Sequence, residues 1–158
     1  MDSDCLVKLT KSGAKEAVLQ AFRVFIPTAV KNETVVEGKR LGFEDAYTIE
    51  KNIKRKLLRA IQVPRSKLKP FPATKGEVAV LSVYMRGGFG AVASDDRKFL
   101  GRLEAVNIPY LTPAACVLYL FLTGSKSKPE TLILLGKLRA WVSREEYEIA
   151  KFYLEGKP

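Results

Sequence analysis

Short apolar runs alternate with stretches of helical periodicity along most of this chain, and this alternation limits the possible folds more than any other feature. Strands are predicted at residues 23–26, 60–63, 91–93 and 108–111, with helical stretches between them. Because neighbouring parallel strands need a helix-length connection, the pattern indicates a mainly parallel sheet with helices on both faces. We therefore expect an α/β fold with three layers, α/β/α, around a mainly parallel central sheet.

The predicted helices are marked by their periodicity and by the residues at their ends. Pro27 suits the first turn of a helix because its φ is fixed, and apolar residues three and four apart define the helix at 43–59. Residues 64–74, rich in Pro and Lys, are expected to form a connector. The predicted helices are residues 6–9, 14–22, 28–38, 43–59, 76–85, 96–106, 112–122, 129–140 and 143–154.

The length of the chain, 158 residues, is typical of one domain. We expect a single domain over residues 1–158, made of a core at 1–124 and a helical extension at 125–158 that packs on this core. Within the extension, Ser143 and Glu146 fit a capping box, in which the hydroxyl and the carboxylate satisfy each other's free backbone N–H groups.

The side chains that this chain lacks exclude several kinds of catalysis. It has no His and only two Cys, Cys5 and Cys116, which lie far apart in the sequence. We expect both thiols to be small buried groups in a reducing compartment. Without His, a Ser or Cys nucleophile lacks its usual base and a His-rich zinc site cannot form. Carboxylates are therefore the natural carriers of any chemistry.

The apolar segments are too short to cross a membrane. The longest of them, near residues 114–122, falls well below the roughly 20 residues that span a bilayer. The N-terminus is acidic where a secretory signal would be basic, and no cleavage pattern follows it. We expect a cytoplasmic protein with no membrane partner.

Positive charge is concentrated in the middle of the chain, whose net charge is +10. The segment from residue 51 to residue 75 contains no Asp or Glu. Such a stripe is typical of a surface that binds a nucleic acid, because each neutralised phosphate releases counterions. It is also typical of a solvated helix face in a heat-adapted protein. The basic residues of the stripe are Lys51, Lys54, Arg55, Lys56, Arg59, Arg65, Lys67, Lys69 and Lys75.

Two carboxylates follow the apolar run at 91–93, where the chain reads Ser94-Asp95-Asp96. Parallel sheets place their chemistry at the carboxyl ends of strands, which is where Asp95 would lie. The same residues could instead cap the helix that follows. Other acids could converge on this edge from separate elements, and carboxylates that converge need a cation such as Mg²⁺ or Mn²⁺ between them. These acids are Asp2, Asp4, Glu33 and Glu77.

In order and spacing, these motifs resemble the PIN-domain nucleases from Asp2 to about Leu122. Residues 2–6 (DSDCL) look like the family's opening aspartate motif, and residues 26–33 (IPTAVKNE) look like its proline-led helix with an acid. Residues 76–79 (GEVA) are similar to the motif that supplies a third acid, 94–98 (SDDRK) to the last metal-binding turn, and 107–112 (NIPYLT) to the short strand after it.

This resemblance implies a metal-dependent endoribonuclease, often the toxin of a prokaryotic toxin and antitoxin pair. The cofactor would be Mg²⁺ or Mn²⁺, which lowers the pKa of a bound water and stabilises charge on the phosphate. The basic stripe would hold the RNA backbone. The implied partners are RNA, a small antitoxin protein and a second copy of the chain.

The resemblance also implies a role for each acid. Asp2 and Asp95 would bind the metal directly. Glu33 and Glu77 would bind it or orient a metal-bound water, and Glu37, one turn from Glu33, competes with it for this role. The residues that would support these ligands through hydrogen bonds are Asp4, Ser94 and Asp96.

The first strand departs from the family pattern, since only Met1 precedes Asp2. Either this central strand is truncated, which leaves Asp2 loosely held, or the true start of the chain lies further upstream. Two other functions therefore stay open. One is an RNA-binding module of low or no activity on the same fold, and the other is a protein-interaction module.

Overall fold

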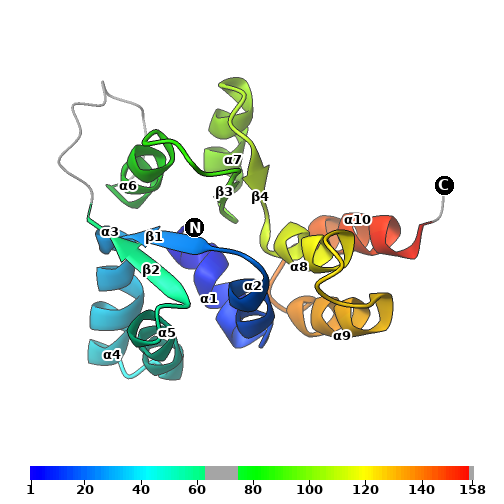
Figure 1. Cartoon of the computed structure of the whole chain (residues 1–158), viewed down its shortest axis with the longest axis horizontal. Coiled ribbons are helices and arrows are strands. Elements are labelled where there is room, and N and C mark those ends of the chain that lie inside the picture. Colours follow the sequence, from blue (N-terminus) through cyan, green and yellow to red (C-terminus); the bar gives the residue numbers. More distant parts are fainter. Residues whose placement is uncertain (63–74, 157–158) are drawn as a thin grey trace.

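The computed structural model describes residues 1–62 and 75–156 of the chain (Figure 1). Its strands are short, and all of them pair in parallel. The predicted connector at 64–74 lies outside the described residues. The predicted RNA-binding residues in this segment are Arg65, Lys67 and Lys69.

The strands form two separate sheets of two strands each. Strand β1 (Val24–Pro27) pairs with β2 (Leu58–Ile61), and β3 (Val92–Ala93) pairs with β4 (Tyr110–Leu111). The α/β class is confirmed, whereas the three-layer arrangement around one central sheet is not.

The first two residues of the chain lie between the two sheets and bond to both. The N-terminal amino group donates to the Phe25 carbonyl at 2.9 Å, and the Asp2 backbone N–H donates to the Ala93 carbonyl at 2.9 Å. Two residues provide too few hydrogen bonds to join the pairs into a single sheet. They do fix the position of Asp2 next to the end of β3.

Helix α1 (Ser3–Lys11) begins directly after this link and is followed by α2 (Lys15–Ala21). Asp2 caps α1, because its side chain accepts a hydrogen bond from the Cys5 backbone N–H at 2.9 Å. The apolar face of α1 is fully buried. The helix predicted at 6–9 is present and extends further in both directions, over Ser3–Lys11. The helix predicted at 14–22 is confirmed.

A continuous helical run follows β1. It consists of α3 (Thr28–Lys31), the wider π-helical turn η1 (Asn32–Glu37) and α4 (Gly38–Arg40), in agreement with the helix predicted at 28–38. Helix α5 (Glu44–Lys54) is shorter than the predicted 43–59. Lys56 has φ 60°, a left-handed conformation that a helix cannot contain, so β2 begins at Leu58 rather than at residue 60.

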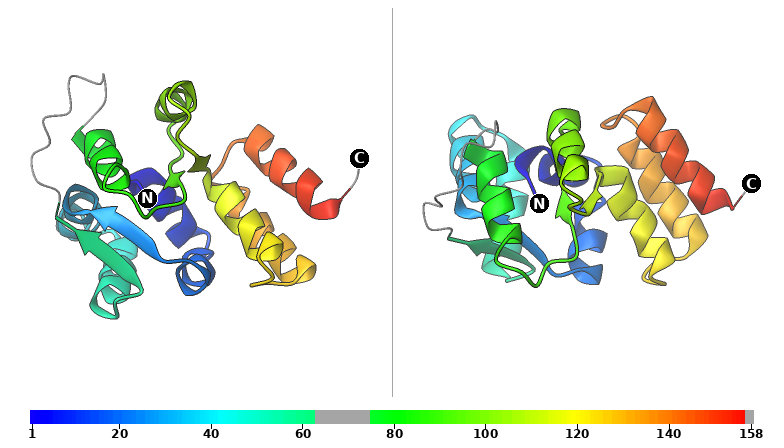
Figure 2. Two further views of the ribbon diagram at one scale, coloured as in Figure 1. Left: turned by 45° about the horizontal axis from the view of Figure 1, so that its top comes forward. Right: turned by 90° about the horizontal axis from the view of Figure 1, so that it is seen from above.

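The second half of the chain alternates helix and strand as predicted. Helix α6 (Lys75–Tyr84) precedes β3, and α7 (Arg97–Ala105) connects β3 to β4. Helix α8 (Pro113–Leu122) then packs against α9 (Lys128–Leu138) and α10 (Arg144–Glu155), and Figure 2 shows these three helices side by side.

The capping box predicted at Ser143 is only half present. The Ser143 hydroxyl accepts from the Glu146 backbone N–H at 3.2 Å, but the Glu146 carboxylate instead accepts from the Ala114 backbone N–H at 2.8 Å. This bond ties α10 to the first turn of α8. A complete capping box is formed by Ser127 and Glu130 at the start of α9.

Both cysteines are free and buried, as predicted. A hydrogen bond with Cys116, together with burial, raises the pKa of the Cys5 thiol well above its ordinary value, so this thiol stays protonated. Trp141 is 40% exposed, and the Lys11 ammonium lies 5.1 Å from its ring centre. Within residues 1–62 and 75–156, no helix has the length and apolar character that crossing a bilayer requires.

Candidate active site

Asp2, Ser94 and Asp95 lie together at the carboxyl end of β3. The hydrogen bond from the Asp2 backbone to Ala93 places the Asp2 side chain beside Ser94, which is fully buried. Burial raises the pKa of the Asp2 carboxyl, and hydrogen bonds from Ser94 and from the Cys5 backbone oppose this rise. Asp2 is therefore a partly buried carboxylate whose position is fixed by its backbone hydrogen bond.

The sequence left open whether the acids at 95 and 96 lie at a strand end or cap the next helix, and the structure shows one residue in each position. Asp96 caps α7 by accepting from the backbone N–H groups of Lys98 (2.8 Å) and Phe99 (2.9 Å). Asp95 lies at the strand end and forms an ion pair with Lys8 of α1. Only 14% of the Asp95 side chain and 30% of the Lys8 side chain are exposed. An internal cation thus balances the charge of Asp95.

Glu33 approaches the same edge from η1. Its carboxylate accepts a hydrogen bond from the Ser3 hydroxyl at 2.6 Å, which brings it next to the first residue of α1. Glu37, the alternative, forms an exposed ion pair with Arg40 at 2.7 Å. Of these two acids, Glu33 is therefore the one that contacts the start of α1.

Glu77 is buried in the first turn of α6, and it forms an ion pair with Arg102 of α7 at 3.4 Å. Asp4 is exposed in the first turn of α1.

Carboxylate and hydroxyl oxygens suit a hard divalent cation. Nevertheless, the described part of the chain contains no group of three acids, Cys or His that could hold a metal ion. The donors fit in kind, but the four predicted ligands are not gathered into one cluster.

A cleft of about 660 Å³ opens beside Asp95. One wall comes from Lys8, Tyr110 and Thr112, and the opposite wall comes from α10, including Tyr153. Arg97 and Glu145 connect the two sides through an ion pair at 3.3 Å. Neither Lys8 nor the α10 wall was predicted, because nothing in the sequence relates residue 8 or residues 143–153 to the turn at 94–96.

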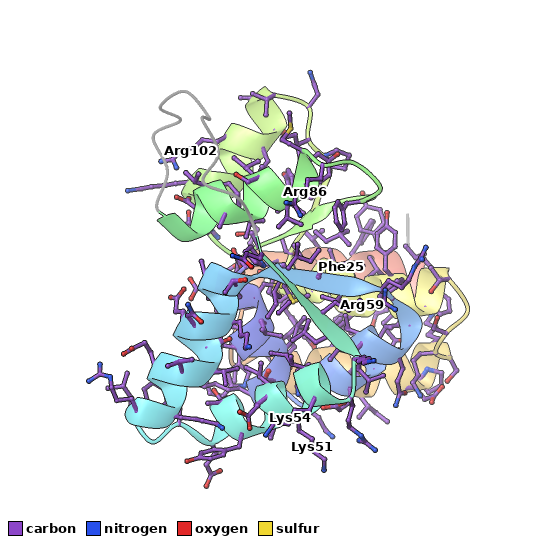
Figure 3. All side chains as sticks on the ribbon, turned by 60° about the vertical axis from the view of Figure 1, so that its left-hand side comes forward. Phe25, Lys51, Lys54, Arg59, Arg86 and Arg102 are labelled. Atoms are coloured by element: carbon purple, nitrogen blue, oxygen red, sulfur yellow. The ribbon has the colours of Figure 1, made fainter. Side chains whose placement is uncertain are left out.

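The predicted basic residues of the stripe from Lys51 to Arg59 are all exposed, as an interface with RNA requires. Lys54 is paired with Glu50 at 2.9 Å. Figure 3 shows Lys51, Lys54 and Arg59 on one face together with Arg86, which was not among the predicted RNA-binding residues. These exposed residues are Lys51, Lys54, Arg55, Lys56 and Arg59.

The burial of Asp2 leads to a prediction about stability. Because its folded pKa is raised above the ordinary 3.8, stability falls as pH rises from that value through the folded pKa. Asn caps helices as well as Asp does. We therefore expect Asp2→Asn to melt at a higher temperature than wild type at pH 7, with no advantage near pH 3.8. Melting curves at both pH values test this, with Asp96→Asn as the matched cap variant, and a lower melting temperature for Asp2→Asn at pH 7 would contradict it.

Comparison with known families shows that a family model described as a PIN domain matches residues 1–148 of the chain. It extends beyond Leu122, where the resemblance of the motifs ends, and includes α9 and part of α10. No curated protein and no solved structure matches the chain.

Proposed function

Because the chain belongs to the PIN-domain family, whose members are generally nucleases, we propose that it is an endoribonuclease that depends on Mg²⁺ or Mn²⁺. The substrate would be RNA, and the products would arise by hydrolysis of a phosphodiester bond. The observation that carries this proposal is the hydrogen bond from the Asp2 backbone N–H to the Ala93 carbonyl, which holds Asp2 beside Ser94. The next residue, Asp95, lines an open cleft.

Asp2 and Asp95 would hold the metal, with Glu33 and Glu77 as further ligands or as groups that orient water, and Asp4, Ser94 and Asp96 as hydrogen-bonding support. When bound, the ion would supply an activated water and stabilise charge on the phosphate. Lys8 would have to release Asp95 for this carboxylate to act as a ligand. The exposed cations from Lys51 to Arg59 would neutralise the phosphates of the bound strand.

Protein partners belong to the same proposal. PIN-domain proteins often pair with antitoxins, and we propose a small antitoxin or a second copy of the chain as partner. The support is an apolar strip on α10, where Ile149, Phe152 and Tyr153 are 52%, 49% and 64% exposed. Ile149 and Tyr153 also line the cleft, so a partner seated there would block it.

The proposed activity is tested by incubating labelled single-stranded RNA with the purified chain and Mn²⁺, and in parallel with EDTA. We expect internal cleavage with Mn²⁺ and none with EDTA. Cleavage that continues in excess EDTA would rule out metal dependence, and intact RNA at saturating Mn²⁺ would rule out the nuclease.

A second candidate function is RNA binding without cleavage. It is favoured by the two ion pairs, Lys8 with Asp95 and Arg102 with Glu77, since each supplies a protein cation to an acid that a metal would otherwise neutralise. This module would bind RNA equally well with Mn²⁺ or with EDTA and leave it intact.

Replacing Lys8 separates the two functions further. Lys8→Gln leaves the Asp95 carboxylate without its cation, so we expect a loss of about 1–3 kcal/mol in the free energy of unfolding. If Asp95 is a metal ligand, Mn²⁺ should raise the melting temperature of this variant more than that of wild type, because the ion replaces the ammonium. Lys11→Gln is the matched control, since Lys11 pairs with Asp45 on α5 at 4.0 Å. An equal response of both variants to Mn²⁺ would speak against ligation by Asp95.

A further inference from the structure

Phe25 lies on the side of β1 that faces away from the main core. Its neighbours Val24 and Ile26 are buried, whereas Phe25 is half-buried, as alternation along a strand requires. The backbone of Phe25 is bonded to Met1, the residue before Asp2. This aromatic side chain therefore belongs to a strand that borders the candidate active site.

A second aromatic ring is held against Phe25 by the loop after α6. The rings of Phe25 and Phe89 meet edge to face, with their centres 5.2 Å apart at an angle of 80°. Gly87 and Gly88 have φ of 82° and 81°, which side chains other than Gly rarely adopt, so the tight turn that delivers Phe89 depends on them. Phe89 is also half-buried.

Arg59 completes this group from the neighbouring strand. It is in register with Phe25 across the β1–β2 pair, and the centre of its guanidinium lies 5.6 Å from the centre of the Phe25 ring. Arg59 is exposed, and so is Arg86, which precedes the loop. Neither forms an ion pair with an acid anywhere in the described ranges.

Figure 3 shows Arg86, Phe25, Arg59, Lys54 and Lys51 following one another down one face, with Arg102, which is also labelled, beyond Arg86. Lys51 likewise has no acidic partner within the described residues. Aromatic rings beside unpaired cations are the combination with which proteins bind unpaired nucleotides, whose bases stack and whose phosphates are neutralised.

We propose that Phe25, Phe89 and Arg59 form a stacking site for a base of single-stranded RNA, with Arg86 and Lys51 neutralising phosphates on either side. This inference rests on the proposed function for its substrate class, RNA, but not on cleavage. A base-paired duplex is excluded from the site because its bases are already stacked on one another. The strand would then run along the face next to the residues that link β1 to β3.

The test is binding of a fluorescent 12-nucleotide single-stranded RNA, followed by anisotropy in EDTA so that no cleavage can occur. We expect Phe89→Leu and Arg59→Gln each to weaken binding by about 5- to 100-fold, the range that stacking of one base provides. Arg59→Gln should also lower the slope of log affinity against log salt by about 0.7. A 12-nucleotide abasic strand should respond to Arg59→Gln but not to Phe89→Leu.

The chain offers matched controls for both variants. Arg139 lies over the half-buried Tyr147 ring at 5.3 Å, within the C-terminal helices. Arg139→Gln and Tyr147→Leu should leave RNA binding unchanged. If Phe89→Leu and Arg59→Gln bind like wild type while wild type binds tightly, the stacking site is wrong and the proposed function stands. If wild type binds no RNA, both fail.

Discussion

Asp95→Asn is expected to lower the rate of Mn²⁺-dependent RNA cleavage by more than about 100-fold, since residues that only orient a metal ligand already contribute about 10- to 100-fold. The amide keeps the shape of the side chain but loses the negative charge that would attract the cation. The Asp95 side chain is only 14% exposed, so no solvent ion readily replaces this charge. Cleavage of labelled RNA under single-turnover conditions measures the effect.

Asp45→Asn is the matched control for this variant, because Asp45 also pairs with a lysine of α1, yet at a separate cleft. It should cleave RNA at the wild-type rate. Asp95→Asn should still bind RNA in EDTA, because in the proposed function the phosphates contact the exposed cations from Lys51 to Arg59. Equal cleavage by wild type and Asp95→Asn would remove Asp95 from the active site.

Phe99→Ala is expected to lower the free energy of unfolding by about 3–5 kcal/mol, the usual cost of emptying a large buried site. Phe99 is fully buried in α7, and its backbone N–H donates to Asp96. Loss of the ring would therefore also loosen the turn that carries Asp95. Denaturant unfolding measures this loss, and Phe152→Ala, in which the replaced ring is 49% exposed, should lose less than about 1 kcal/mol. A loss below about 1 kcal/mol for Phe99→Ala would mean that α7 is not anchored by this residue.

Local patterns in the sequence predicted most of the helices and strands correctly, because the formation of these elements depends on residues that are neighbours in the sequence. Pro27, the apolar spacing of α5 and the run before Asp95 each mark an element that the structure contains. The end of α5 was missed because it depends on the left-handed conformation of Lys56, which no composition rule predicts for a Lys. The prediction of one central sheet was not confirmed. Between the β1–β2 pair and the β3–β4 pair lie only residues 1 and 2, which make one backbone hydrogen bond to each pair.

The candidate site was predictable to the extent that its residues are near strand ends. The Asp2 backbone N–H donates to the Ala93 carbonyl, so Asp2 lies at the end of β3, near the turn that contains Asp95. The ion pairs of Asp95 with Lys8 and of Glu77 with Arg102 could not be foreseen, since each joins elements whose relative placement is set by packing. The contact of Arg59 with Phe25 could not be foreseen either. It depends on the register of β1 and β2, which the run of basic residues in the sequence does not reveal.

The most direct test of the account is a crystal structure of the protein soaked in Mn²⁺, with the ion located by its anomalous scattering. We expect an ion in contact with the carboxylates of Asp2 and Asp95, and a Lys8 ammonium that has moved away from Asp95. An ion-pair between Lys8 and Asp95 that persists at saturating Mn²⁺, with no ion at this edge, would contradict it.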